Sequence, residues 1–228
     1  MTEKVQWLII IGSGGHGKVA ADAAVASGRY RVAAFADDKY ESDRIKGGIL
    51  HAPLASIQSL LNQIEDARVV VAVGTNSIRM QIVKRLNLPE EKYATIIHPK
   101  AVISPSAKIG HGSVIFAGAV LNADAVIGQH AIVNSNAVVE HDCVIGDFVH
   151  ISPAVAMAGG VHIEMGAHIG IGACLIPGVS VGAWSTLGAG AVAIRDVPAD
   201  CTAVGVPASH IRAKNGLVPS VHLKLAGG

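Results

Sequence analysis

The sequence has few of the residues that hold together disulfide-rich or zinc-ribbon proteins. Among its 228 residues there are only three cysteines, Cys143, Cys174 and Cys201, and no two of them form a CxxC pair. An odd number of widely spaced cysteines argues against a disulfide framework and against a thiolate zinc site. Because free cysteines persist in reducing compartments, we expect a cytoplasmic protein.

Charge, aromatic residues and long apolar runs are also scarce. The net charge is +1, and only 15% of the residues are charged and 4% aromatic. The chain therefore offers no basic field that would attract nucleic acid or an anionic membrane. The longest apolar run near the start, residues 7–11, is too short to span a bilayer and lacks a signal-peptide cleavage pattern. We expect no nucleic-acid partner and no membrane insertion.

The chain is instead rich in aliphatic residues and glycine, and these follow two different periods. In roughly the first 90 residues, short apolar runs alternate with stretches of helical spacing, a pattern that predicts a small parallel sheet with helices. The expected strands are 7–12, 32–38 and 68–74, and the expected helices are 16–27, 56–64 and 78–86.

The second period is six residues long. From Ile97 to Leu187 an aliphatic residue or methionine occupies every sixth position, and the fifth position of each hexapeptide from Ile103 is Ala, Ser, Val or Cys. Self-similarity at a fixed period is the signature of a solenoid, whereas the variable loops of a β-sandwich would break the register. Each hexapeptide should form a short strand and a turn, and three should close a coil of about 18 residues, with coils stacked at ~4.8 Å.

These two periods divide the chain into domains. We predict an α/β lobe over 1–94, a parallel β-helix over 95–212 and a tail over 213–228. The lobe has about three strand–helix units, which is half of a Rossmann dinucleotide-binding fold.

A glycine-rich segment follows the first expected strand. Residues 12–17, GSGGHG, fit the G-x-G-x-x-G pattern, and Asp37 and Asp38 follow about twenty residues later. Taken alone, this pattern is typical of an NAD site. A half-sized lobe suits a single nucleotide better, and a tight strand–helix turn without a ligand is the remaining interpretation.

Six segments together resemble one protein family: GSGGHGK, FADD, AVGTNSIRMQI, IIHPKAVISPSAKIG, NSNAVVEHDCVIGDFVHISP and AVGVPAS. They are similar to the nucleotide-sugar N- and O-acetyltransferases, which include the bacillosamine- and perosamine-pathway N-acetyltransferases and the sialic acid O-acetyltransferases. The resemblance covers about residues 7–212. It implies a left-handed β-helix, acetyl-CoA as co-substrate and a homotrimer with sites between adjacent β-helices.

His141 is the candidate catalytic base. It occupies the third, outward-facing position of its hexapeptide, between Glu140 and Asp142. A carboxylate beside an imidazole can fix its tautomer and raise its basicity, although an exposed corner histidine explains the residues equally well. The resemblance implies that His141 deprotonates the acceptor and that Asp142 orients its ring; the acid here is the shorter Asp.

The coenzyme contacts are implied mainly by the resemblance. His150 matches a residue at the acetyl end of acetyl-CoA, and Ile171 and Ala189 match contacts further along the helix. Gly159 stands 18 residues after His141, so its N–H should lie one coil further on, where it could bond a developing oxyanion. A simple corner glycine is the alternative.

Three basic residues near the end of the repeats could meet the coenzyme phosphates, although surface charges of this kind are usually only solvated. They are Arg195, Arg212 and Lys214.

The resemblance also implies that the lobe holds a UDP-sugar. The residues that match the family's sugar-nucleotide contacts are Gly14, Gly15, His16, Asp37, Asp38 and Gly74.

A metal site is not expected. His150 and His168 are 18 residues apart and should occupy neighbouring rungs, with His162 on another face. The γ-class carbonic anhydrases bind zinc on this fold with an H-x4-H pair, and no two histidines here are five residues apart.

The favoured function is acetyl transfer from acetyl-CoA to an amino group on a UDP-linked deoxyamino sugar, of the UDP-4-amino-4,6-dideoxy-N-acetylglucosamine type, in surface-glycan biosynthesis. Cys143 takes an inward fifth position, so we expect no acyl-enzyme. The alternatives are O-acetylation of sialic acid or a related sugar, an NAD-dependent oxidoreductase, and a nucleotide-sugar-binding scaffold without turnover.

Overall fold

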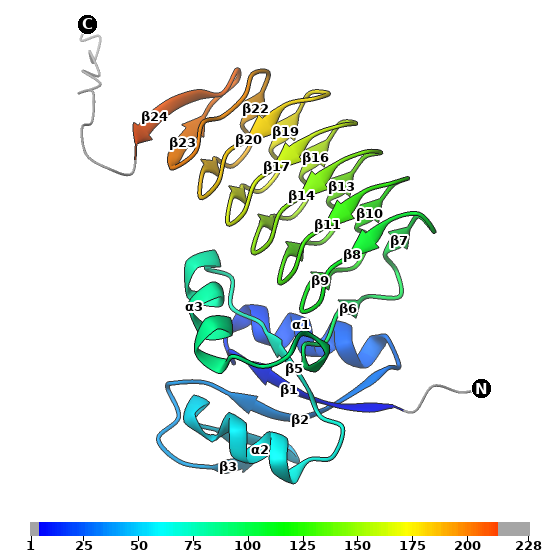
Figure 1. Ribbon diagram of the computed structural model, residues 1–228, viewed down its shortest axis with the longest axis vertical. Coiled ribbons are helices and arrows are strands. Elements are labelled where there is room, and N and C mark those ends of the chain that lie inside the picture. The colour runs from blue at the N-terminus through cyan, green and yellow to red at the C-terminus, as the bar shows by residue number, and fades with distance from the viewer. Residues whose placement is uncertain (1–4, 214–228) are drawn as a thin grey trace, which may run out of the picture.

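The computed structural model describes residues 5–213 of the chain, which form an α/β lobe and a long β-helix that extends from it (Figure 1). No helix between residues 5 and 213 is long and apolar enough to cross a membrane.

The lobe contains a five-stranded sheet in the order β3-β4-β2-β1-β5, in which β1, β2, β4 and β5 run parallel. Its strands are β1 (Gln6–Ile11), β2 (Tyr30–Ala36), β3 (Arg44–Lys46), β4 (Ile49–Ala52) and β5 (Arg68–Val71). Its helices are α1 (Gly15–Ala26), α2 (Ile57–Gln63) and α3 (Asn76–Leu86), with short 3-10 turns at Leu54–Ser56 and Glu90–Lys92. The three strands and three helices expected from the sequence are confirmed, with slightly different ends.

One hairpin of the lobe was not predicted. Strand β3 pairs antiparallel with β4 through Gly47 and Gly48, whose φ angles of +58° and +78° suit a two-residue primed turn. The Gly-Gly pair between two short runs was the available signal. It was missed because every residue of β3 is exposed, so the strand carries no apolar pattern.

Helix α1 lies between the lobe sheet and the first coils of the β-helix, whereas α2 covers the opposite face of the sheet (Figure 1). A single apolar cluster joins Ile10 of β1 and Ala24 of α1 to Val114, Phe116 and Ile132 of the β-helix. Full burial of such a side chain stabilises the fold by roughly 1.5–3 kcal/mol. The two parts of the chain are therefore joined by a buried apolar interface, which is separate from the interior of the β-helix.

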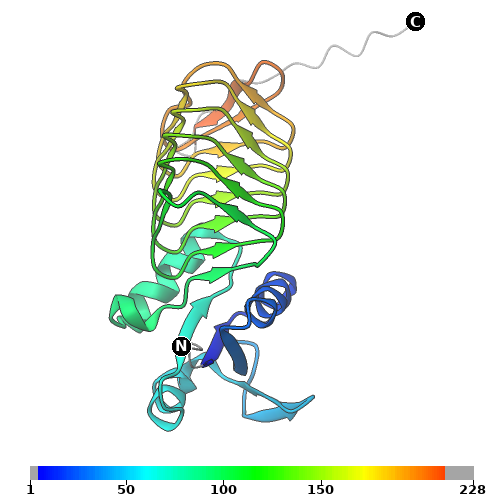
Figure 2. The same ribbon diagram turned by 90° about the vertical axis from the view of Figure 1, so that its right-hand side faces the viewer.

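The β-helix consists of stacked coils with three sheets on their sides, which are parallel except for β24, the antiparallel partner of β23 (Figure 2). The first sheet contains β7 (Val102–Ile103), β10 (Val120–Leu121), β13 (Val138–Val139), β16 (Ala156–Met157), β19 (Cys174–Leu175) and β22 (Val192–Ala193). The second contains β8 (Lys108–Ile109), β11 (Val126–Ile127), β14 (Val144–Ile145), β17 (His162–Ile163) and β20 (Ser180–Val181). The third contains β6 (Ile96–Ile97), β9 (Val114–Ile115), β12 (Ile132–Val133), β15 (His150–Ile151), β18 (His168–Ile169), β21 (Thr186–Leu187), β23 (Cys201–Val204) and β24 (Ser209–Ala213).

The predicted register is confirmed. Strands pair with partners 18 residues away, as in His150 with His168, and the first and fifth positions of the hexapeptides fill the interior. The fourth position of each hexapeptide from Gly112 to Gly190 has a positive φ angle, including Asp142 at 59° and Trp184 at 57°. Glycine, Asn and Asp tolerate this conformation best, which explains their frequency at the turns. The fold is the expected left-handed β-helix.

Candidate active site

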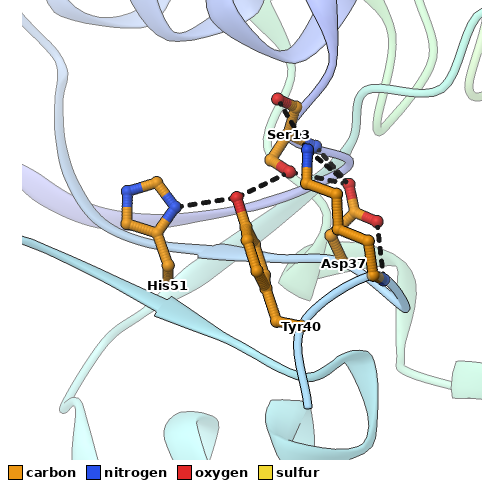
Figure 3. A network of polar contacts seen from close by, with 5 residues as sticks. Ser13, Asp37, Tyr40 and His51 are labelled. Atoms are coloured by element: carbon orange, nitrogen blue, oxygen red, sulfur yellow. Dashed lines mark hydrogen bonds and ion pairs between the residues drawn. The ribbon is translucent and has the colours of Figure 1, made fainter. Parts of the chain in front are cut away.

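A chain of hydrogen bonds fixes the glycine-rich loop of the lobe (Figure 3). The Tyr40 hydroxyl donates to Ser13 Oγ at 2.9 Å, and Ser13 Oγ donates to Asp37 Oδ2 at 2.7 Å. His51 Nδ1 lies 2.9 Å from the Tyr40 hydroxyl. Since that hydroxyl gives its single proton to Ser13, His51 Nδ1 must be the donor to Tyr40. The loop after β1 is thus tied to both β2 and β4.

Asp37 therefore serves mainly to hold the loop. Its Oδ2 also accepts the Ser13 backbone N–H at 2.8 Å, and its Oδ1 accepts the Lys39 N–H at 3.2 Å. Partial burial acts to raise the pKa of Asp37, but the bonds from Ser13 outweigh it and keep that pKa below its ordinary value. Asp38 is exposed beside it, and no described residue hydrogen-bonds its carboxylate. Of the two acids, Asp38 is the one open to a ligand.

A lobe cavity of about 380 Å³ opens beside this loop. It gathers all the lobe residues singled out in the sequence, namely Gly14, Gly15, His16, Asp37, Asp38 and Gly74. A Cβ atom at Gly14, Gly15 or Gly74 would meet nothing within 4 Å, so the backbone there borders free space. Gly17 differs, because its Cβ would overlap the Gly12 carbonyl. The first three glycines leave room for a ligand, and Gly17 is required by helix–strand packing.

A second cavity, the seam cavity, lies where the lobe meets the β-helix and measures about 490 Å³. It is bounded by residues 74–77, at the start of α3, and by side chains of the third sheet and its turns, including His150, His168 and Trp184. Gly74 borders both cavities. A ligand held in the lobe cavity could therefore extend past Gly74 into the seam cavity.

His150 is packed into this seam. Its Nδ1 lies 3.3 Å from the Gly74 carbonyl oxygen, and its ring centroid lies 4.8 Å from that of His168 and 6.1 Å from that of His16. Burial, followed by the nearby His168, Arg79 and His16, lowers the pKa of His150 to about 3. Burial and Arg79 lower the pKa of His16 to about 4. Both rings are neutral at physiological pH.

Arg79 was not singled out from the sequence, although it lies in the AVGTNSIRMQI segment. Its side chain is 1% exposed and reaches from α3 to the β-helix. The Nε donates to the His130 carbonyl at 2.8 Å, Nη1 to Val73 at 2.8 Å and Nη2 to Phe148 at 2.7 Å. An arginine is normally assigned to the surface, so no pattern in the sequence signals this burial.

The His141 corner lies at the turn between β13 and β14. His141 Nδ1 is 2.8 Å from Asp142 Oδ2, and the two side chains are 62% and 67% exposed. The hydrogen bond that His141 donates to Asp142 raises the pKa of His141, with smaller contributions from the charges of Asp142 and Glu140. With Nδ1 engaged by the carboxylate, Nε2 is the nitrogen left to accept a proton.

Gly159 packs against the His141 ring. A Cβ there would overlap Cε1 of the imidazole and lie 2.6 Å from Nε2. The glycine is thus required by the ring itself, a reason the sequence did not suggest. Among the described residues, none accepts a hydrogen bond from the Gly159 N–H, which leaves it available to a ligand.

A single chain does not bring the predicted site residues together. The lobe cavity is lined by lobe residues, and the seam cavity adjoins the third sheet and the turns that precede it, whereas His141 lies at the turn from the first sheet to the second. Ile171 and Ala189 are exposed on the remaining edge, at turns from the third sheet to the first. Arg195 is also exposed, while the Arg212 side chain and Lys214 fall outside the described parts of the chain.

The described residues do not favour catalysis by Cys143 as a nucleophile or by a bound metal ion. Cys143 is fully buried, donates to the Ala158 carbonyl at 3.2 Å and has its thiol pKa raised by burial, so it is a poor nucleophile. In residues 5–213, no group of three or more His, Cys, Asp and Glu side chains is arranged to hold a metal ion.

An exposed His–Asp pair at the edge of a left-handed β-helix is the arrangement expected of a hexapeptide-repeat acetyltransferase, and comparison with known proteins agrees. Residues 7–86 match the family described as the PglD N-terminal domain. PerB of Caulobacter crescentus, solved with CoA and GDP-perosamine, is 37% identical, with 92% of this chain and 99% of that chain covered and a TM-score of 0.82. The acetyltransferase domain of PglB from Neisseria gonorrhoeae, solved with acetyl coenzyme A, is 39% identical, with 91% and 100% covered and a TM-score of 0.81.

The UDP-N-acetylbacillosamine N-acetyltransferase of Bacillus subtilis (strain 168) is 45% identical over 96 residues. That match spans 41% of this chain and 44% of the relative, which is less than half of each. From the near-complete coverage of the two solved structures, the chain belongs to the family of nucleotide-sugar N-acetyltransferases.

Proposed function

We propose that this protein transfers an acetyl group from acetyl-CoA to the amino group of a UDP-linked 4-amino-4,6-dideoxy sugar. The observation that carries the proposal is the His141 corner, where an exposed imidazole bonded to Asp142 lies against Gly159. An imidazole whose pKa is raised by a carboxylate is suited to accept a proton from an attacking amine.

The reaction needs neither a metal nor an acyl-enzyme. The sugar amine attacks the thioester carbonyl carbon while His141 Nε2 takes the proton that the nitrogen loses. The free N–H of Gly159 bonds the oxyanion of the tetrahedral intermediate. The intermediate then expels CoA thiolate, which receives a proton, and the products are the amide and CoA thiol.

The lobe cavity is proposed to hold the nucleotide, with Asp38 and the Gly14–Gly15 backbone as contacts, and the seam cavity to receive the sugar. The relatives include enzymes named for UDP- and for GDP-linked sugars. We favour UDP because the residues that line the cavity match the UDP-sugar contacts implied by the family resemblance, and one relative is named for a UDP-linked sugar. Calorimetry should show binding of UDP, weaker binding of GDP, and no binding of NAD or NADP. Tight NAD binding without a UDP effect would contradict the assignment.

Gly14→Val gives this assignment a structural test. The φ angle of Gly14 is −77° and free space lies beside it, so valine should fold normally but fill the cavity. We expect loss of UDP binding with acetyl-CoA binding intact. Normal UDP binding in the variant would place the nucleotide elsewhere.

A homotrimer is proposed because His141 and the seam cavity lie on different sides of one β-helix. A neighbouring copy can bring its corner to the cavity that a single chain leaves apart. Light scattering should give about three times the chain mass of 23.3 kDa. A fully active monomer would contradict this assembly.

A thiol-release assay with acetyl-CoA separates the candidate reactions. UDP-4-amino sugars should release thiol, and sialic acids and other hydroxyl acceptors should not. Release only with a hydroxyl acceptor would favour O-acetylation, and no release with any acceptor would favour a nucleotide-sugar-binding scaffold. A cytoplasmic location stays a proposal, supported by the three unpaired cysteines.

A further inference from the structure

Among the described residues, the buried guanidinium of Arg79 has no acidic partner. Its partners are backbone carbonyls of the lobe and of the β-helix, together with the Asn76 side-chain oxygen at 2.9 Å. No carboxylate of the described residues forms an ion pair with it. Burial lowers the pKa of Arg79 to about 10, so the group still carries its charge at neutral pH. A buried cation without a counter-ion is costly, and its retention calls for a reason beyond packing.

The backbone at Val73 and Gly74 forms the wall that the two cavities share, here called the Gly74 wall, and Arg79 lies behind it. Its Nη1 donates to the Val73 carbonyl and also lies 3.4 Å from the Gly74 carbonyl oxygen. Its Nε and Nη2 hold the turns at His130 and Phe148. The side chain therefore fixes the Gly74 loop relative to the β-helix without reaching either cavity itself.

The hydrogen bonds of His150 permit one protonation state. The Gly74 carbonyl can only accept, so His150 Nδ1 must carry a hydrogen. The Asn134 side-chain nitrogen, 3.3 Å from His150 Nε2, can only donate, so Nε2 must be unprotonated. The neutral Nδ1–H tautomer satisfies both bonds, whereas a charged ring would direct an N–H at the Asn134 amide nitrogen.

Burial is the largest cause that lowers the pKa of His150, and three neighbouring side chains add to it. His168 approaches from β18, Arg79 from α3 and His16 from α1, whereas the hydrogen bond to the Gly74 carbonyl favours the proton. Arg79 is the only one of the three side chains that is charged at neutral pH. Its field is thus present throughout the pH range well below its pKa of about 10.

We propose that Arg79 is a positioning residue for acetyl transfer, which fixes the Gly74 wall against the β-helix and holds His150 as the neutral Nδ1–H tautomer. The inference rests on the proposed function, because the wall is where the nucleotide sugar would cross from one cavity to the other. Loss of the cation frees the wall and raises the pKa of His150, and a proton on Nε2 would break the bond from Asn134.

The test compares Arg79→Met, which removes the charge, and Arg79→Lys, which keeps it, with Arg85→Met, which removes an exposed charge of the same helix. Histidine NMR on the full-length protein, assigned with His150→Gln, follows protonation of His150. In the wild type, Arg85→Met and Arg79→Lys, His150 should stay neutral down to pH 5. In Arg79→Met its titration should move to higher pH than in the wild type. A titration in Arg79→Met like that of the wild type would overturn the proposal.

Kinetics separate the two parts of the role. The KM for the acceptor should rise about tenfold in Arg79→Lys, which cannot make the same bonds to the carbonyls, while kcat stays within about twofold. In Arg79→Met the KM should also rise as the pH falls. If Arg79→Met does not fold, Arg79→Lys still decides, because an unchanged acceptor KM there overturns the positioning role. If the wild type releases no thiol with any acceptor, the proposed function fails, whereas the NMR titrations need no turnover.

Discussion

Two histidines nine residues apart have opposite environments. His141 is exposed at a turn, bonded to a carboxylate, with a raised pKa. His150 is half-buried at the seam, next to an arginine and two other histidines, with a pKa of about 3. One ring is suited to accept a proton and the other to stay neutral. Their positions in the hexapeptide decide this, because the third position faces solvent and the sixth, on the third sheet, faces the lobe.

The largest expected effect tests the exposed member of this pair. His141→Ala should lower kcat by roughly 10²–10⁴ with little change in acetyl-CoA affinity, since it removes the general base. Steady-state thiol release measures this, and His162→Ala, at an exposed histidine of the second sheet, is the control. Near-normal turnover in His141→Ala, with another histidine essential, would refute the assignment.

Gly159→Ala should displace the His141 ring without unfolding the coil. The new Cβ would lie 2.6 Å from Nε2, and a side chain yields more easily than backbone. A shift of about 1 Å can cost roughly 10² in turnover. In a His141→Ala background the same substitution should cost much less, so the double-mutant cycle isolates the ring. Equal losses in both backgrounds would point to the Gly159 backbone instead.

Asp142→Asn should have a smaller effect, about tenfold in turnover. The amide can still bond the ring but cannot raise its pKa, so the acidic limb of the pH–rate profile should move to lower pH. Asp124→Asn, at the same hexapeptide position one coil earlier, is the control. An unchanged pH profile would show that Asp142 does not tune the base.

The smallest effect concerns the seam. The pKa values of His16 and His130 are about 4 and that of His150 about 3, all below the ordinary 6.5. Between about pH 6.5 and 4 the unfolded chain binds more protons, so stability is complete above this window and falls as the pH drops through it. Each histidine contributes a slope of up to about 1.4 kcal/mol per pH unit.

Urea unfolding at fixed protein concentration, from pH 7.5 to 5, measures this slope. His130→Phe should reduce it, since the ring stacks on Phe148 and its imidazole Nδ1 has no partner among the described residues. His162→Gln should leave it unchanged. A flat profile in the wild type would contradict the neutral seam.

The repeat made most of the fold predictable. A strict six-residue period determines which side chains face inward, so the interior of the β-helix followed from the sequence alone. The lobe helices followed from their apolar spacing. The exposed β3–β4 hairpin has no such pattern and was missed.

The candidate site was less predictable, because its contacts join distant segments. The lobe cavity gathers the glycines and acids expected to lie together, and their roles remain predictions. The burial of Arg79 depends on carbonyls of turns 51 and 69 residues further along the chain, at His130 and Phe148. Asp37 holds the loop and Asp38 stays open to a ligand because the Ser13 backbone and hydroxyl bond only Asp37. No local pattern encodes such contacts.

From β6 to β22 each strand pairs with residues 18 positions away, so the coils follow one another at a fixed spacing along the axis. Adding or removing one whole coil would shift the His141 corner along the axis by ~4.8 Å and keep it on the same edge. Adding six residues would rotate it to another edge. The distance between base and lobe can therefore change only in whole steps, so acceptors of intermediate length must be accommodated by the loops of the lobe.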